Sequence, residues 1–460
     1  MAGAGAVSAS VRSQVWGAAE EVPGTAALNQ GGNAEVSSVS CASAGNCSAG
    51  GNYEDSSGNI QAFVVSQTGG AWHTAIEVPG TAGLNGGGFA ELDSLSCASA
   101  GNCSAGGVYD TASNQLEAFV VSQVSGTWHK AIEVPGIAAL NQGGSADITS
   151  VSCASAGNCS AGGRYSDSLD NNQVFVVSQT GGTWHKAIEV PGSAALNQGG
   201  SAFLTSVSCG SAGNCTAGGS YFDISHNRQA FVVSQTGGTW HKAIEVPGSA
   251  ALNQGGIAEV NSVSCAPAGN CSAGGRYFDG SIRQEAFVAS QTGGTWHTAI
   301  EVPGTAALNQ GGVAGVASVS CASAGNCSAG GHYSDNSSHS QAYVVSQVNG
   351  TWHTAIEVPG SAPLNQGGNA GISSVSCGSA GNCSAGGLYK DGSGHHQALV
   401  VSEVNGTWQT AIEVPGSAPL NQGGNAGIPS VSCGSAGNCS AGGHYKDGSG
   451  HSQALVASQT

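Results

Sequence analysis

The chain has 460 residues, of which 76 are glycine; only 8% are charged, and the formal net charge is −17. Contacts with phosphates require clustered basic side chains, and the 10 Lys and Arg are not clustered, which argues against nucleic acid and anionic membranes as partners. No stretch approaches the ~20 consecutive apolar residues that span a bilayer, so we expect no membrane insertion.

A strict internal repeat organises the sequence. Eight units of 56 residues occupy nearly the whole chain, so we expect one repeat domain over residues 16–460. Residues 1–15 are rich in Ala and Gly and resemble the end of a signal peptide, with a candidate cleavage point near Ala9. A cloning scar is the alternative for this segment. The tryptophans that mark the repeat are Trp16, Trp72, Trp128, Trp184, Trp240, Trp296, Trp352 and Trp408.

The 16 cysteines form eight pairs with five residues between the two members. Zinc sites usually have closer pairs and a second pair at finger-like distance, which is not the pattern here. We therefore predict a disulfide within each pair, contributing roughly 2 kcal/mol, and a secreted protein in an oxidising environment. Each bond is expected to clamp the neck of the short turn between its two cysteines. The pairs are Cys41 and Cys47, Cys97 and Cys103, Cys153 and Cys159, Cys209 and Cys215, Cys265 and Cys271, Cys321 and Cys327, Cys377 and Cys383, and Cys433 and Cys439.

Each repeat contains four short runs with β-strand character, separated by turn residues. In one unit these are Trp72–Val78, Leu92–Cys97, Cys103–Tyr109 and Glu117–Gln123. The first run alternates, which places its Trp, Thr, Ile and Val on one face and its His, Ala and Glu on the other. No run has helical periodicity of useful length, so the sequence predicts an all-β fold.

Four antiparallel strands per repeat are typical of a β-propeller blade. We expect the Ser-Val-Ser-Cys run to be the inner strand, followed outwards by the Cys-Ser-Ala-Gly-Gly run, the Phe-Val-Val run and the Trp-led run. The sequence begins with a Trp-led strand (Trp16–Val22) and ends with a third strand (Ala454–Gln459). Pairing of these two strands would close an eight-bladed ring without free edges; an open solenoid is the alternative. The Trp residues are expected to cover blade flanks.

Two known repeat types share local features with this unit. The Gly-Gly at the end of the second strand, the Tyr two residues later (Gly51 to Tyr53) and a Trp followed by Pro resemble kelch repeats. The turn at residues 66–72 resembles a shortened Asp-box turn without its Asp. The whole unit, over residues 16–460, is similar to tandem repeats of uncharacterised secreted proteins of actinobacteria. This resemblance implies a propeller but no activity, because such propellers include oxidases, sialidases and binding modules.

The connections between strands divide between the two faces of the expected ring. Residues 42–46 and 68–71 and their equivalents form short turns on one face, hereafter the tight-turn face. Residues 23–33 and 54–60 and their equivalents form longer connections on the other, the long-loop face. Because longer loops more often carry binding residues, we expect any loop-based site on the long-loop face.

Two polar features recur on the long-loop face. An Asn precedes Gln-Gly-Gly or Gly-Gly-Gly in every unit, and a Tyr-x-Asp opens the second loop in all units but one, where Tyr109-Asp110-Thr111 replaces it. Amide, carboxylate and aromatic groups together suit a sugar, so these residues are our candidate ligand-binding site. Turn formation by Asn and loop capping by Asp are the alternatives. The candidates are Asn29, Tyr53, Asp55, Asn141, Tyr165, Asp167, Asn197, Tyr221, Asp223, Asn253, Tyr277, Asp279, Asn309, Tyr333, Asp335, Asn365, Tyr389, Asp391, Asn421, Tyr445 and Asp447.

The symmetry of the repeat favours many weak sites over one catalytic centre. We therefore predict a secreted, non-enzymatic protein that binds a glycan or cell-wall polymer multivalently. No metal or other cofactor is expected, although the Asp-lined loops leave calcium open. One alternative is an enzyme acting on polysaccharide, hinted at only by the divergent loop around Asp167, Asp170 and Asn171. A structural or surface-assembly scaffold is the other. The four Arg of blades three to five are scattered in the sequence, and no catalytic residue is assigned.

Overall fold

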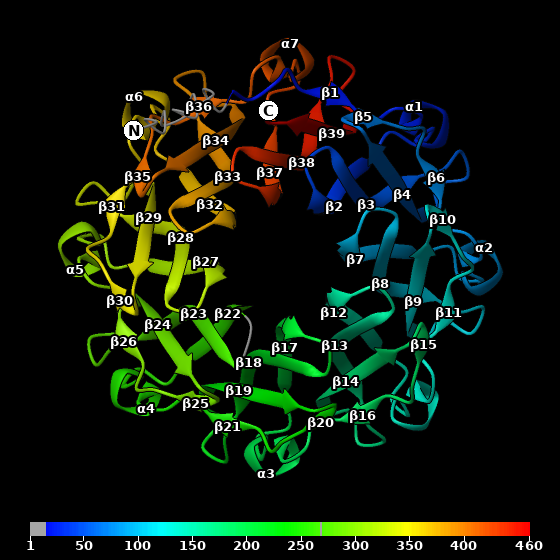
Figure 1. Cartoon of the computed structure of the whole chain (residues 1–460), viewed down its shortest axis with the longest axis horizontal. Helices are drawn as coiled ribbons and strands as arrows, with labels where there is room; N and C mark the ends of the chain where they lie inside the picture. The colour runs from blue at the N-terminus through cyan, green and yellow to red at the C-terminus, as the bar shows by residue number, and fades with distance from the viewer. Residues whose placement is uncertain (1–14, 267–268) are drawn as a thin grey trace, which may run out of the picture.

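The computed structural model describes residues 15–266 and 269–460. Eight sheets are arranged around a central axis (Figure 1); in seven of them the strand order follows the chain from the inside outwards, and in the eighth the first strand of the chain is outermost. The fold is an all-β, eight-bladed β-propeller, as predicted. The segment 1–15, expected to be a leader remnant, lies outside the described residues except for Val15. Among the described residues, no helix is long and apolar enough to cross a membrane.

The three inner strands of every blade are long and nearly identical from blade to blade. The innermost strands are β2 (Ala34–Ser43), β7 (Ala90–Ser99), β12 (Ala146–Ser155), β17 (Ala202–Ser211), β22 (Ala258–Ala266), β27 (Ala314–Ser323), β32 (Ala370–Ser379) and β37 (Gly427–Ser435). The second strands are β3 (Asn46–Glu54), β8 (Asn102–Asp110), β13 (Asn158–Ser166), β18 (Asn214–Phe222), β23 (Asn270–Phe278), β28 (Asn326–Ser334), β33 (Asn382–Lys390) and β38 (Asn438–Lys446). The third strands are β4 (Ile60–Thr68), β9 (Leu116–Val124), β14 (Asn172–Thr180), β19 (Arg228–Thr236), β24 (Gln284–Thr292), β29 (Ser340–Val348), β34 (His396–Val404) and β39 (Ser452–Ser458).

The outer strand of blades 1 to 7 is split into two short pieces, where the sequence predicted one continuous strand. The first pieces are β5 (Ala71–Trp72), β10 (Thr127–Trp128), β15 (Thr183–Trp184), β20 (Thr239–Trp240), β25 (Thr295–Trp296), β30 (Thr351–Trp352) and β35 (Thr407–Trp408). The second pieces are β6 (Ile76–Glu77), β11 (Ile132–Glu133), β16 (Ile188–Glu189), β21 (Ile244–Glu245), β26 (Ile300–Glu301), β31 (Ile356–Glu357) and β36 (Ile412–Glu413).

The split has a physical cause at the blade junction. The backbone N–H of Ala75 donates to the carbonyl of Pro23 in the neighbouring blade at 2.7 Å instead of to its own sheet. This breaks the predicted alternation, so that Ala75 is buried and Ile76 is 45% exposed. The expectation that Ile76 shares a face with Trp72 was therefore wrong.

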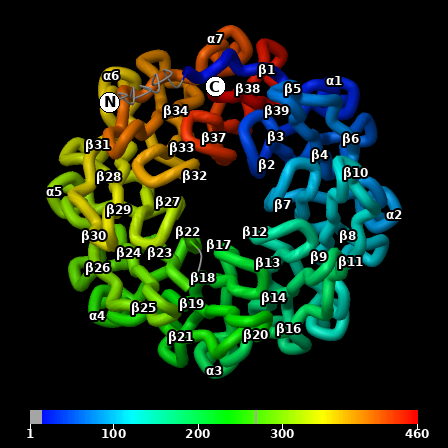
Figure 2. Tube along the Cα trace, viewed as in Figure 1, coloured from blue at the N-terminus to red at the C-terminus, as the bar shows by residue number. Residues whose placement is uncertain are grey.

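The first and last strands of the described chain complete one blade. Strand β1 (Glu20–Glu21) pairs antiparallel with β39, with Glu20 opposite Val456, and Trp16 forms a bridge with Gln459. The blue and red ends of the trace meet in this blade (Figure 2). The closed ring predicted from the order of the strands is confirmed, and no open solenoid forms.

The hydrophobic core is divided into eight clusters that lie between blades. Each cluster joins the third strand of one blade to the inner strands of the next, as where Ala62 and Val64 of blade 1 pack with Leu92 and Phe119 of blade 2. The Trp side chains belong to these clusters, and Trp296, for example, is only 8% exposed. Their predicted role as a structural cover is thus confirmed.

A single helical turn begins each connection from an outer strand to the next inner strand. The turns are α1 (Thr25–Leu28), α2 (Thr81–Leu84), η1 (Ile137–Ala139), α3 (Ser193–Leu196), α4 (Ser249–Leu252), α5 (Thr305–Leu308), α6 (Ser361–Leu364) and α7 (Ser417–Leu420). The residue before each turn is the Gly of the Pro-Gly dipeptide, such as Gly24 with φ of 88°, a conformation that other residues rarely adopt.

The Gly-Gly of the second strand is required by two different contacts. A Cβ on Gly50 would lie 2.9 Å from the side chain of Leu92 in the next blade, as expected for close blade packing. A Cβ on Gly51 would instead collide with the carbonyl oxygen of Glu35 in its own blade. The second glycine therefore serves the pairing of strands within a blade.

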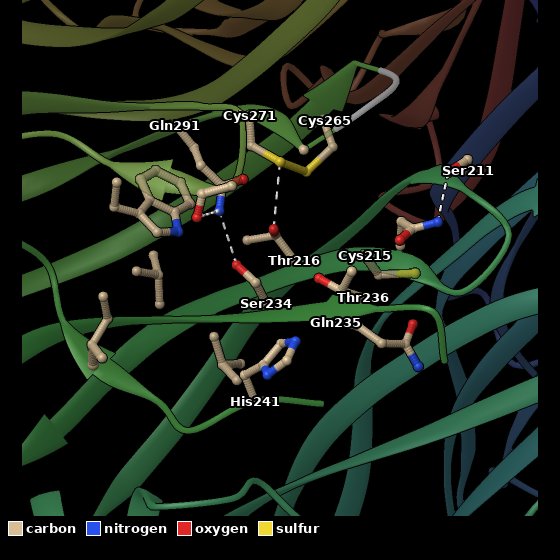
Figure 3. Close-up of a pocket in the computed structure, with 18 of the residues that line it drawn as sticks. Ser211, Cys215, Thr216, Ser234, Gln235, Thr236, His241, Cys265, Cys271 and Gln291 are labelled. Atoms are coloured by element: carbon tan, nitrogen blue, oxygen red, sulfur yellow. Dashed lines mark hydrogen bonds between the residues drawn. A yellow bond between two sulfur atoms is a disulfide. The ribbon is translucent and has the colours of Figure 1, made fainter. Parts of the chain in front are cut away.

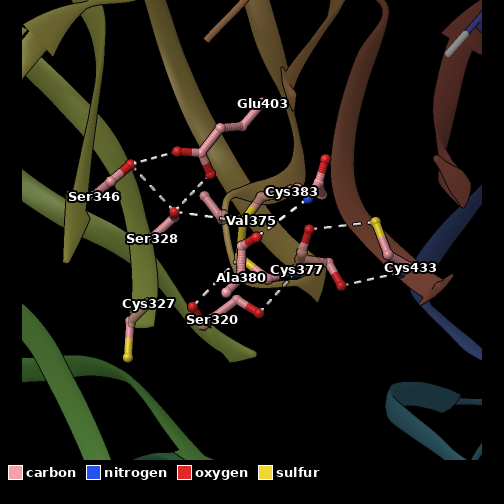
Figure 4. The surroundings of a disulfide bond; sticks show 12 residues. Ser320, Cys327, Ser328, Ser346, Val375, Cys377, Ala380, Cys383, Glu403 and Cys433 are labelled. Carbon is pink, nitrogen blue, oxygen red and sulfur yellow. Dashed lines mark hydrogen bonds between the residues drawn. A yellow bond between two sulfur atoms is a disulfide. The ribbon is translucent and has the colours of Figure 1, made fainter. Parts of the chain in front are cut away.

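All eight predicted disulfides are present, and each links the inner and second strands of one blade. Figure 4 shows one of them, between Cys377 and Cys383, with its neighbours. Among the described residues, no cysteine is free. Eight such bonds indicate an oxidising environment. The bonds join Cys41 to Cys47, Cys97 to Cys103, Cys153 to Cys159, Cys209 to Cys215, Cys265 to Cys271, Cys321 to Cys327, Cys377 to Cys383, and Cys433 to Cys439.

The second cysteine of a pair also takes part in the blade junction, which the spacing did not indicate. The hydroxyl of Ser104 in blade 2 contacts the sulfur of Cys159 in blade 3 at 3.5 Å. In the same way, the hydroxyl of Ser384 in blade 7 contacts the sulfur of Cys439 in blade 8 at 3.4 Å. Cys159 and Cys439 are 5% and 3% exposed, and both belong to core clusters between blades. The predicted disulfides of Cys159 and Cys439 are therefore confirmed. The expectation that each bond only clamps its own turn was incomplete, because the sulfur of the second cysteine also packs against the preceding blade.

Candidate functional site

The repeated Asp residues of the long-loop face cap their own loops. The Asp391 carboxylate accepts the backbone N–H groups of Ser393 at 2.8 Å and His395 at 2.9 Å, and the side-chain amide of Gln397 at 2.8 Å. Burial raises the pKa of Asp391, but these hydrogen bonds outweigh it and hold the pKa below its ordinary value. In blade 2, the hydroxyl of Thr111 accepts the loop N–H groups in place of a carboxylate.

The repeated Asn residues join neighbouring blades. Asn421 donates its amide to Gln397 Oε1 at 2.8 Å and to the His396 carbonyl at 2.9 Å, both in the preceding blade, and its oxygen accepts the N–H of Asn425. Because Gln397 also bonds Asp391, the structure links the Asp of one blade to the Asn of the next through a Gln. Asn29 makes the same contacts to blade 8.

The repeated Tyr residues are buried, and their hydroxyls bond to carboxylates of the outer strand. Tyr165 is 3% exposed, and its hydroxyl donates to Glu189 on the outer strand of its own blade at 2.9 Å. Burial, followed by the Glu189 charge, raises the pKa of Tyr165. The ring faces are packed inside the blade junction, so Tyr is not available as a flat plate for a sugar. The structure thus brings Asp and Asn together but gives all three residue types intramolecular partners.

The loop carboxylates also do not converge into a cation site. Across residues 15–266 and 269–460, no three His, Cys, Asp or Glu side chains are grouped as metal ligands. In those loops the carboxylate oxygens are already engaged by N–H donors. Calcium therefore gains no support from the described residues.

Cavities lie instead on the tight-turn face, at the junctions between blades. Four of them, with volumes from 440 to 650 Å³, have equivalent linings at the junctions of blades 1 and 2, 3 and 4, 4 and 5, and 5 and 6. We call these the junction pockets. In each, the outer strand of one blade contributes a His, a Lys or Thr, and an Ile, and the next blade contributes a Trp and a glycine-containing turn.

The junction pocket between blades 4 and 5 shows how the wall is built (Figure 3). Gln291 of blade 5 donates to Ser234 of blade 4 at 3.0 Å, and Thr216 contacts the sulfur of Cys271 at 3.4 Å. These contacts fix the polar floor. His241 is exposed at the rim, and Ile244 is 44% exposed, so each pocket combines an apolar surface with imidazole, amide and hydroxyl groups.

Sequence reasoning missed this site for a structural reason. The alternation of the Trp-led run placed Ile76 on the same face as Trp72, and His73 on the opposite face. The break at Ala75 turns Ile76 outwards, and only the seating of the next blade converts the strand flank into a cavity wall. The small Ala between larger residues was the one available signal.

A second group of residues lies at the inner strands, at the end that faces the long loops. Asp93 is flanked by Glu91 and Asp147; burial, then these two charges, raises the pKa of Asp93 to about 8. Burial also raises the pKa of Glu91, with Glu35 adding to the effect. This acidic arc spans blades 1 to 3; in the other five blades only Glu259 of blade 5 carries a carboxylate at an equivalent position.

The Arg residues that are scattered in sequence gather beside the acidic arc. Arg164 pairs with Asp147 at 3.2 Å, and both Arg228 and Arg276 pair with Glu259. The guanidinium carbons of Arg164 and Arg228 lie 5.6 and 5.2 Å from the centre of the Phe203 ring. The expectation that no Arg cluster exists was wrong, because neighbouring blades bring together positions that the sequence separates.

Comparisons with known proteins add the following. No protein-family model matches the chain, and no curated protein does. Among solved structures, it is similar to a protein of unknown function from Dyadobacter fermentans, at 12% identity over 67% of this chain and 93% of that one, with a TM-score of 0.38. A Hadza microbial sialidase matches at 11% identity over 75% and 73%, with a TM-score of 0.36.

A Pyrococcus horikoshii acylaminoacyl peptidase matches at 8% identity over 82% of this chain and 52% of that one, with a TM-score of 0.43. Likenesses at this level concern the fold alone, and none supports an argument about activity.

Proposed function

We propose that this protein is a secreted, multivalent binding protein that recognises glycans or a cell-wall polymer at its junction pockets. The observation that carries the proposal is the recurrence of one pocket, with the same kinds of side chain, at successive junctions of a rigid ring. Linked equivalent sites raise avidity by roughly 10²–10⁴ when geometry permits simultaneous contact.

The chemistry of the pocket supports a sugar as the ligand. An exposed Ile side chain, as at Ile244, offers an apolar surface for the C–H face of a pyranose. His241 lies beside it and can bond hydroxyl groups. The volumes of 440 to 650 Å³ suit one or two sugar units.

A glycan and polysaccharide array, probed with the oxidised protein, tests the proposal. The variant I76S/I188S/I244S/I300S removes the apolar surface from the four described pockets, and we expect binding to fall at least tenfold. The control L169S/I224S/I282S removes three apolar side chains that are even more exposed from the long-loop face and should bind normally. Loss of glycan binding in the control but not in the pocket variant would place the site on the long loops. The Asn, Tyr and Asp residues would then again be candidate ligand-binding residues.

A blank array would overturn glycan binding. Ordered self-association of the same sample would then favour the surface-assembly scaffold.

The acidic arc favours a second candidate function, a hydrolase or lyase acting on polysaccharide. A carboxyl whose pKa is raised to about 8, as at Asp93, is protonated at neutral pH and can act as a general acid with Glu91 and Asp147 beside it. The Asp93→Asn variant should then abolish release of reducing ends from a polysaccharide panel. Absence of activity in the wild-type protein over the panel between pH 5 and 9 would reject this candidate.

A further inference from the structure

One position separates the junction pockets into two kinds. The second residue after the Trp is Lys130, Lys186 or Lys242 in blades 2, 3 and 4, whereas blades 1, 5, 6 and 7 carry Thr there. Lys186 and Lys242 line their pockets in the same place where Thr74 and Thr298 line theirs. The pockets are otherwise built from the same residue types, so the charge is their main difference.

These lysines have no counter-charge among the described residues. Every salt bridge in that part of the chain involves Arg or His, and none includes Lys130, Lys186 or Lys242. The chain has only 10 Lys and Arg against 27 Asp and Glu, so three such cations at one repeated position concentrate much of its basic charge.

The backbone beneath each lysine is fixed. The following Ala donates its N–H to the Pro carbonyl of the preceding blade, at 2.8 Å for Ala187 and 2.7 Å for Ala243. The Lys186 and Lys242 stems pass over the Gly of the same Pro-Gly turn, at Gly136 and Gly192. Lys186 and Lys242 are thereby kept in the lining of their pockets.

We propose that the pockets lined by Lys186 and Lys242, together with the equivalent Lys130 position of blade 2, form a contiguous strip selective for anionic glycans, meaning polymers with carboxylate, sulfate or phosphate substituents. The Thr-bearing pockets take neutral sugars. This inference rests on the proposed glycan-binding function. It adds a preference for anionic ligands and says which part of the ring binds them.

The closing experiment compares oligogalacturonate with its methyl ester, which has the same backbone without the charge, by calorimetry at pH 7.5. We expect the wild-type protein to bind the acid roughly tenfold more tightly, since three exposed charge contacts contribute a few tenths of a kcal/mol each. The variant K186T/K242T uses the residue that other blades already carry, and should reduce the preference to about twofold. A sulfated dextran compared with dextran provides the second anion chemistry.

The control K390S/K446S removes the same number of charges from the long-loop face and should keep the tenfold preference. Ser already occupies this position at Ser166 and Ser334. Equal binding of acid and ester by the wild-type protein, or an unchanged preference in K186T/K242T, would overturn the anionic strip while leaving glycan binding intact. Failure of the wild-type protein to bind acidic and neutral oligosaccharides alike would overturn both proposals.

Discussion

The two faces of the ring differ in how strictly they keep the repeat. On the tight-turn face, the disulfide loops and the pocket side chains hardly change from blade to blade, apart from the Lys and Thr exchange. On the long-loop face, the start of the inner strand carries Glu35, Asp147, Phe203 or Gly315 at one repeated position. A position that carries the same residue in every blade produces many equivalent sites around the ring. A position whose residue differs between blades produces an arrangement that occurs only once.

The variable face also shows how the protein accommodates its own exceptions. Where Thr111 replaces the loop Asp, Glu117 stands in place of the Gln that bonds it. Where Asp279 and Glu285 occur together, Arg283 pairs with Glu285 at 3.4 Å. In blade 2 the pair therefore has one carboxylate beside a neutral hydroxyl, and in blade 5 a cation accompanies the two carboxylates.

Asp93→Thr should have the largest effect on stability. The next two blades carry Thr149 and Thr205 at this position, and their hydroxyls donate to the carbonyls of Leu204 and Val260 across the junction. An ionised Asp cannot donate. Burial and neighbouring charges raise the pKa of Asp93 to about 8. The contribution of its protonated carboxyl to the free energy of unfolding is therefore fully present below about pH 4 and is lost as the pH rises through about 8.

We therefore expect Asp93→Thr to raise the free energy of unfolding by a few kcal/mol at pH 9 and by much less at pH 4. Guanidinium titrations at pH 4, 7 and 9 measure the difference. A gain that does not change with pH would show that the carboxyl charge is not its source.

Asp391→Ala tests the structural role of the long loops. The variant leaves the N–H groups of Ser393 and His395 and the amide of Gln397 without their acceptor, and should cost about 2 kcal/mol. Thr111→Ala removes longer bonds of 3.1 and 3.3 Å and should cost less. Hydrogen exchange of the two loops provides the local measurement, and glycan affinity should be unchanged in both variants.

Glu403→Gln restores the residue found at this position in every other blade. Glu403 is 1% exposed and accepts the hydroxyls of Ser328 at 3.0 Å and Ser346 at 2.8 Å (Figure 4). The equivalent Gln347 in addition donates to the Gly350 carbonyl, which a carboxylate cannot do. Burial raises the pKa of Glu403, so wild-type stability should increase on acidification as the carboxyl takes up a proton.

The variant should gain roughly 1 to 2 kcal/mol at pH 7 and lose that advantage near pH 4, as followed by thermal unfolding. The reciprocal Gln347→Glu should introduce the same penalty in blade 6. A Gln347→Glu variant that unfolds at the wild-type temperature at both pH 4 and pH 7 would contradict this explanation.

Tyr343→Phe should give the smallest gain. Five other blades carry Phe at this position, and the Tyr343 hydroxyl is fully buried without a hydrogen-bond partner among the described residues. Removing it should stabilise the protein by about 1 kcal/mol. The reciprocal change, Phe287→Tyr, should destabilise it by a similar amount, and chemical denaturation of the pair measures both.

Much of the fold follows from the spacing of the repeat. Trp and Cys at fixed intervals predicted the number of blades and the disulfides, and the displaced Trp16 strand predicted closure of the ring. These features depend on residues close in sequence or on the order of the strands, and both can be read from a single sequence. The exposure of Ile76 could not be predicted, because it depends on a hydrogen bond from Ala75 to another blade. The contact of the Cys159 sulfur with Ser104 was missed for the same reason.

The candidate site was harder to predict because its parts also lie on different blades. The sequence shows that Asn29 and Asp55 recur, but it does not show that each is consumed by bonds to a neighbouring Gln or a loop backbone. The junction pockets consist of two halves that lie on different repeats. Similarly, Arg228 and Glu259 belong to separate blades and meet only in the assembled ring.

Pairing of β1 with β39 has a consequence for the folding kinetics. Every other blade forms from residues close in sequence, whereas Glu20 meets Val456 across nearly the whole chain. The entropy of closing a loop grows only logarithmically with its length, so this contact costs little more than a shorter one, but it must wait for the intervening blades. Because each core cluster is shared by two blades, opening this contact would expose two blade flanks together, and unfolding should start there.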